Sequence, residues 1–128
     1  MKKILFLLLI FIICNGCKKD NSFNYSSSLI GKWSWLRSCG GVVGCLGPED
    51  EHVTINVVFT ADSIYDLYQN DTLKFSTRVH TYKLLSRDGK DSANVIKYDS
   101  GVSLNYYITH DTLGLGNSII SSIYKRIH

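Results

Sequence analysis

The stretch LIGKWSWLR (residues 29–37) predicts the first β-strand of the domain, because a glycine and two tryptophans open a short run of strand-forming residues. Seven more short strand patterns follow it, and the last contains Tyr124, Lys125 and Arg126. No segment of the domain carries a sustained apolar period near 3.6 residues. We therefore expect an all-β domain that begins with this strand.

The segments that follow alternate between apolar and polar residues, as half-buried strands do. The alternation is regular in residues 52–59, where Val53 and Phe59 mark the ends of one apolar face. Residues 72–85 form the longest pattern, with Leu73, Phe75 and Val79 on one face, and they fit either one strand or two that break near Thr77 and Arg78. The other predicted strands are 64–69, 93–98, 102–108, 112–115 and 119–127.

About eight short strands, with no helix long enough to cover a sheet, fit either a β-barrel or a β-sandwich. An antiparallel up-and-down barrel is the simpler topology, because consecutive hairpins need no crossover connections. A closed barrel also leaves no exposed sheet edge. We predict an eight-stranded antiparallel up-and-down barrel over residues 29–128.

The first sixteen residues predict a signal peptide. Lys2 and Lys3 precede an unbroken apolar run over residues 4–13. As a helix this run would be about 15 Å long, roughly half the thickness of a bilayer core, so a permanent membrane span is not expected. We predict that residues 1–16 are removed.

Cys17 follows Gly16 directly and precedes two lysines, a pattern that resembles the lipobox of bacterial lipoproteins. The resemblance implies an N-terminal Cys17 that carries acyl chains and holds the protein at a membrane. Cys14 is a poorer site because the bulky Ile13 precedes it, and a plain signal peptide with an incidental cysteine is the alternative. Residues 17–28, rich in serine and asparagine, predict a lipidated cysteine followed by a flexible tether.

The chain that remains after residue 16 has 112 residues, enough for one domain with one core. Without Lys2 and Lys3 it carries twelve basic and eleven acidic residues, so it is close to neutral. It has no stripe of lysine or arginine. We therefore expect no nucleic-acid partner.

Cys39 and Cys45 are the cysteines left in the predicted domain. In an oxidising compartment they are expected to form a disulfide around a short glycine-rich loop. Two free thiols, or a metal site shared with His52, are the alternatives. A tetrahedral site needs more ligands than this neighbourhood offers, so we expect neither a metal nor another cofactor.

The order of motifs is similar to that of the lipocalins. Gly31, Lys32 and Trp33 match the Gly-x-Trp motif that lipocalins carry on the first strand. Arg126 stands near the end of the last strand, where that family places an arginine that packs across the tryptophan. Together with the lipobox and the tether, these motifs resemble the small lipocalin-like lipoproteins of Gram-negative bacteria, over residues 29–128. The resemblance implies a lipid-anchored protein of the cell envelope, at the outer membrane.

The chain also departs from full-length lipocalins. It is shorter, a second family motif is not found before the seventh strand, and no helix pattern follows Ile127. These differences bear on the size of any ligand cavity, because an eight-stranded barrel is just wide enough either to be filled by its side chains or to hold one small ligand.

Two functions remain open. The first is binding of a small apolar ligand inside the barrel, which eight tyrosines, five phenylalanines and two tryptophans could line. The alternative is a solidly packed interaction module that uses the loop between Cys39 and Cys45 to bind a protein, for example as an inhibitor of a hydrolase. We expect no enzymatic activity, because the sequence carries no nucleophile motif, phosphate-binding loop or metal signature.

Overall fold

A computed structural model describes residues 28–128 of the chain. The predicted signal peptide, the predicted lipidation of Cys17 and all but the last residue of the predicted tether lie outside the described residues. Across residues 28–128 the structure contains no helix that is both long and apolar enough to cross a membrane.

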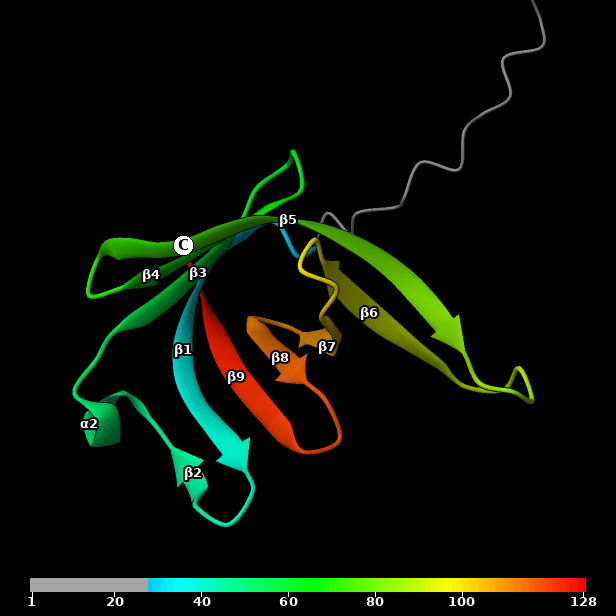
Figure 1. Cartoon of the computed structure of the whole chain (residues 1–128), viewed down its shortest axis with the longest axis horizontal. Helices are drawn as coiled ribbons and strands as arrows, with labels where there is room; N and C mark the ends of the chain where they lie inside the picture. Colours follow the sequence, from blue (N-terminus) through cyan, green and yellow to red (C-terminus); the bar gives the residue numbers. More distant parts are fainter. Residues whose placement is uncertain (1–27) are drawn as a thin grey trace, which may run out of the picture.

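The described part of the chain consists of nine strands and one four-residue helix (Figure 1). The chain order is β1 (Gly31–Gly40), β2 (Gly44–Leu46), α2 (Pro48–Glu51), β3 (Ile55–Phe59), β4 (Ile64–Gln69), β5 (Thr72–Leu85), β6 (Ser92–Tyr98), β7 (Ser103–Thr109), β8 (Thr112–Gly116) and β9 (Ile120–Ile127).

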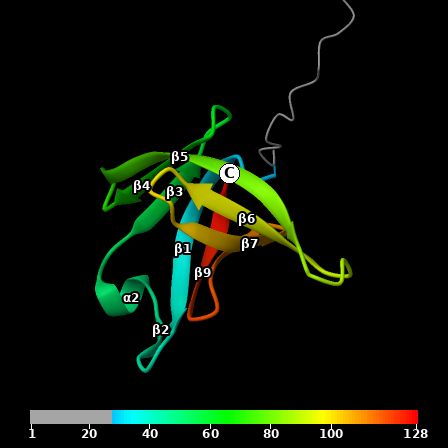
Figure 2. The ribbon, with the colours of Figure 1, turned by 45° about the vertical axis from the view of Figure 1, so that its right-hand side comes forward.

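Eight of these strands form a closed antiparallel barrel, which confirms the predicted fold. From β3 to β9 each strand pairs with the next along the chain, and β1 closes the ring by pairing with both β3 and β9 (Figure 2). The contact between the first and last strands is extensive, with Lys32 opposite Ile127 at one end and Gly40 opposite Ile120 at the other. The barrel therefore has an end near Lys32 and an end near Gly40.

The ninth strand, β2, lies outside the ring. It pairs only with the last residues of β1, along the same edge of β1 that holds β3 farther up. The chain leaves the sheet after Leu46, forms α2, and returns to the sheet as β3. Between β2 and β3 the middle of β1 is left without a strand partner on this edge.

The first strand runs over Gly31–Gly40 where 29–37 was predicted, and four others shift by a single residue at one or both ends. Two further predictions differ in kind. The strand predicted at 52–59 begins only at Ile55, because His52 is the C-cap of α2 and takes a left-handed conformation (φ 53°), which is not a strand conformation. β5 is continuous, so the possible break near Thr77 is absent from it. A bulge pairs Leu67 with Phe75 but Tyr68 with Leu73, which turns Leu73 away from the face that carries Phe75.

The core is the interior of the barrel. It holds thirteen buried apolar residues, seven of them aromatic, and strands β1 and β3 to β9 all contribute. An eight-stranded ring has an interior that side chains of this size can fill. The core residues are Leu29, Trp33, Trp35, Val57, Phe59, Tyr65, Val79, Ile96, Tyr98, Tyr106, Leu113, Leu115 and Tyr124.

Candidate functional site

Trp33 and Arg126 close the barrel at the end where β1 begins. They lie opposite each other on β1 and β9, and the Arg126 guanidinium carbon sits 4.0 Å from the centre of the fully buried Trp33 ring. Arg126 donates two hydrogen bonds, from Nη1 to the Ile30 carbonyl at 2.9 Å and from Nη2 to the Ser28 carbonyl at 2.5 Å. The guanidinium thus fixes the incoming chain to the last strand.

Gly31 makes room for this arrangement. Its φ of 137° is one that side chains rarely adopt, and a Cβ at this position would lie 2.8 Å from Nη1 of Arg126. The structure therefore brings Gly31, Trp33 and Arg126 together, as the resemblance to lipocalins implies. Their role here is to seal one end of the barrel.

Three tyrosines from different strands meet in the barrel interior. The ring of Tyr65 lies 5.1 Å from that of Phe59 and 5.3 Å from that of Tyr98, both within the range of favourable aromatic pairs. Burial raises the pKa of Tyr65, Tyr98 and Tyr124 well above the usual tyrosine value, because the phenolate would lose its hydration. The interior thus holds neutral, closely packed aromatic side chains.

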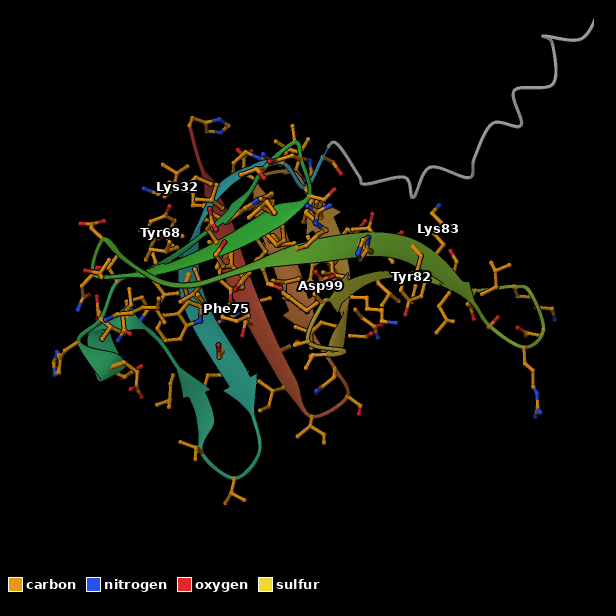
Figure 3. All side chains as sticks on the ribbon, turned by 45° about the horizontal axis from the view of Figure 1, so that its top comes forward. Lys32, Tyr68, Phe75, Tyr82, Lys83 and Asp99 are labelled. Carbon is orange, nitrogen blue, oxygen red and sulfur yellow. A yellow bond between two sulfur atoms is a disulfide. The ribbon has the colours of Figure 1, made fainter. Side chains whose placement is uncertain are left out.

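Phe75 is the exception to this packing. The register of β5 directs it to the same face as Leu67, which packs against the core, and its ring lies 6.3 Å from that of Tyr65. Even so, 46% of Phe75 is exposed to solvent. Figure 3 labels it on β5, with Tyr82 and Lys83 farther along the same strand. Phe75 is thus an inward-facing apolar ring, close to the β4–β5 turn, that the barrel covers only in part.

The predicted disulfide is present. Cys39 and Cys45 are joined by an S–S bond of 2.04 Å and lie opposite each other on β1 and β2. Their sulfurs are bonded to each other, so the alternatives of two free thiols and of a metal site with His52 are wrong. The bond closes a hairpin whose turn is made of Gly41, Val42 and Val43.

The turn of this hairpin presents apolar side chains to solvent. Val42 is fully exposed (106%) and Val43 nearly so (74%). Gly41 and Gly44 flank them with φ values of 62° and 83°, which the tight turn requires. The hairpin thus holds two valines outward in a covalently closed ring.

The turn between β8 and β9 adds two isoleucines beside this hairpin. Ile120 pairs with Gly40, and a Cβ on Gly40 would collide with the backbone of Ile119 and Ile120, so the two turns are in direct contact. Ile119 and Ile120 are both exposed. We call the four residues Val42, Val43, Ile119 and Ile120 the apolar tip.

A hollow of about 490 Å³ opens between β1, the β2 arm of the hairpin and α2, on the edge where the middle of β1 has no strand partner. A bulge at Leu36 interrupts the pairing of β1 with β9. Asp50 holds the opposite wall by accepting a 2.7 Å hydrogen bond from the Gly47 amide at the start of α2. The hollow is lined by Leu36, Arg37, Cys45, Leu46, Gly47, Pro48, Glu49 and Asp50.

The charge around the hollow and the hairpin is negative. Residues 38–54 contain Glu49, Asp50 and Glu51 but no lysine or arginine. Within residues 28–128 none of these three carboxylates forms an ion pair. In the same range no three His, Cys, Asp or Glu side chains are grouped so that they could hold a metal ion.

The sequence predicted the disulfide-closed loop but neither the apolar tip as a whole nor the hollow. The hollow depends on the bulge in β1, on β2 and on α2, and none of these was predicted. Pro48 after Gly47, with three acidic residues next, is the helix-start signal that could have revealed α2. No local sequence pattern indicates that Gly40 and Ile120, 80 residues apart, bring their two turns into contact.

Comparisons of this chain with protein-family models, with curated proteins and with solved structures found no match.

Proposed function

We propose that this protein is a lipid-anchored protein of the bacterial cell envelope, held at the outer membrane by Cys17, and that its lipocalin-like barrel presents the apolar tip and the hollow to a protein partner. The observation that carries the proposal is Val42, an apolar side chain that is fully exposed in a hairpin closed by a disulfide. The role proposed is binding and not catalysis.

The energetics favour a binding surface at this place. The four apolar side chains of the tip are each more than half exposed, and complete burial of a fully exposed one such as Val42 would contribute about 1.5–3 kcal/mol. Side chains at two touching turns form a patch of the kind that marks interaction sites. The disulfide and the pairing with β9 hold the patch in one conformation, so a partner would lose less entropy on binding.

The packing of the barrel supports a scaffold more than a carrier. Seven aromatic side chains occupy the interior, and the hollow lies outside the ring, on the surface of β1. The envelope location is supported by the lipobox-like sequence at Cys17 and by the disulfide, which forms in oxidising compartments.

Binding of a small apolar ligand is the second candidate, and Phe75 favours it. The ring faces the core side of β5 and is 46% exposed, and the hydroxyl-bearing Tyr65 lies beside it. A ligand with one polar group could pack on the exposed part of the Phe75 ring.

Photo-crosslinking tests the main proposal. A photoreactive phenylalanine analogue replaces Val42 in the full chain, which is expressed in the organism that it comes from. The control is the same chain with the analogue at Leu84. Leu84 is also an exposed apolar residue, but it lies on the β5–β6 hairpin. The proposal predicts a discrete protein adduct from position 42 and none from position 84. Equal labelling from both positions, or no protein adduct from position 42, would contradict it.

A further inference from the structure

We infer that the partner of this surface offers an apolar cleft bordered by lysine or arginine residues. The apolar tip enters the cleft, and a basic side chain of the partner enters the hollow beside it. This inference rests on the proposed function and adds the chemistry of the partner.

The charges around the hollow favour a basic partner. Glu49 and Glu51 lie exposed on α2, next to the hairpin, and neither forms an ion pair within the described range of residues 28–128. Asp50 is different, because its carboxylate already accepts the Gly47 amide hydrogen bond. Complementary charges around an apolar centre bring partners together and exclude the wrong ones.

The lining of the hollow suits a long basic side chain. Leu36, Leu46 and Pro48 provide apolar surface, and Glu49 provides a carboxylate at the same site. Lysine and arginine bury an aliphatic stem along apolar surface while the charged group stays with polar atoms. Arg37 is the single basic residue of the lining, so Glu49 and Asp50 leave the hollow with a net negative charge.

A lipid bilayer fits the same surface less well. The valines of the tip could enter a membrane, but the three carboxylates of α2 follow in the same part of the chain, and residues 38–54 contain no lysine or arginine. Bilayer surfaces that carry anionic lipids attract basic segments and repel acidic ones. The favoured occupant is therefore a protein.

The test compares two charge reversals in the full chain with the photoreactive residue at position 42. Glu49→Lys with Glu51→Lys reverses the charge at the surface and keeps Asp50, which α2 needs for its first turn. Asp66→Lys with Asp91→Lys changes the net charge by the same amount on β4 and in the β5–β6 turn. Near-ultraviolet circular dichroism checks that both variants keep the native barrel.

The inference predicts that the double glutamate variant lowers the yield of the protein adduct at least tenfold, whereas the double aspartate control stays within twofold. It also predicts that the cross-linked peptide of the partner, identified by mass spectrometry, lies at an apolar cleft with lysine or arginine on its border. Equal adduct yields from both variants would overturn the basic partner and leave the proposed function standing. Adducts to lipid in place of protein would overturn both.

Discussion

Replacement of Arg126 by alanine is expected to destabilise the barrel by about 3 kcal/mol. The change removes the stacking of the guanidinium on Trp33, a contact worth about 1 kcal/mol when partly buried. It also removes two charge-assisted hydrogen bonds, to the carbonyls of Ile30 and Ser28. Each contributes about 1 kcal/mol here, because the Arg126 side chain is 21% exposed and water can partly replace it.

Urea unfolding followed by near-ultraviolet circular dichroism measures this loss as a lower midpoint at an unchanged slope. Lys125→Ala is the matched control, since the neighbouring side chain is exposed and its loss should change the stability by less than about 0.5 kcal/mol. Arg126→Lys should fall between the two, because lysine keeps the charge but lacks the planar group that stacks and bonds to two carbonyls. If Arg126→Ala were no more destabilising than Lys125→Ala, Arg126 would not seal the barrel.

Three further predictions concern the hairpin, the sheet and the interior. Replacement of Cys39 and Cys45 by serine should lower the free energy of unfolding by about 2 kcal/mol and leave the near-ultraviolet circular dichroism spectrum of the barrel intact. Loss of that spectrum would contradict this, because it would show that the barrel cannot fold without the disulfide. Asn56→Val should raise the free energy of unfolding by about 1 kcal/mol, because the buried Oδ1 of Asn56 has no hydrogen-bond partner within residues 28–128. Urea unfolding should show this as a higher midpoint, and a lower midpoint would refute it. Burial raises the pKa of Tyr65 and Tyr98 in the folded state, so the unfolded chain releases these protons at lower pH than the folded chain does. The free energy of unfolding should therefore be unchanged below pH 10 and fall above it, by up to about 3 kcal/mol per pH unit for the two tyrosines together. Thermal unfolding across this range, with Tyr98→Phe expected to show a shallower decline, measures the effect; equal slopes would contradict it.

The barrel could be predicted from the sequence because its determinants are local. Alternation of apolar and polar residues gave the strands, and the short turns between them allowed only neighbouring strands to pair. The predicted bounds of 64–69 agree with β4, because the bulge in its pairing with β5 places the extra residue on β5 and leaves β4 continuous. The pairing of Cys39 with Cys45 followed from the lack of other cysteines in the domain, and the structure confirms it.

The apolar tip and the hollow could not be predicted in the same way, because they depend on departures from regular alternation. A single looped residue at Leu36 breaks the pairing of β1 with β9, and the chain must leave the sheet after Leu46 to open the hollow. The bulge that turns Leu73 outward is also a departure from alternation, because one extra residue in a strand moves every residue beyond it to the opposite face of the sheet. The contact between Gly40 and Ile120 depends on closure of the whole ring.

Native mass spectrometry of the processed chain, extracted from membranes in a mild detergent, tests most directly whether the barrel is a scaffold or a carrier. For a scaffold we expect the mass of the protein with its anchor alone, two mass units below that of the reduced chain, with no component lost on denaturation. A discrete small molecule that stays bound to the folded protein and is released on denaturation would contradict the scaffold role. It would indicate a ligand-binding barrel, with Phe75 as the first candidate for the binding site.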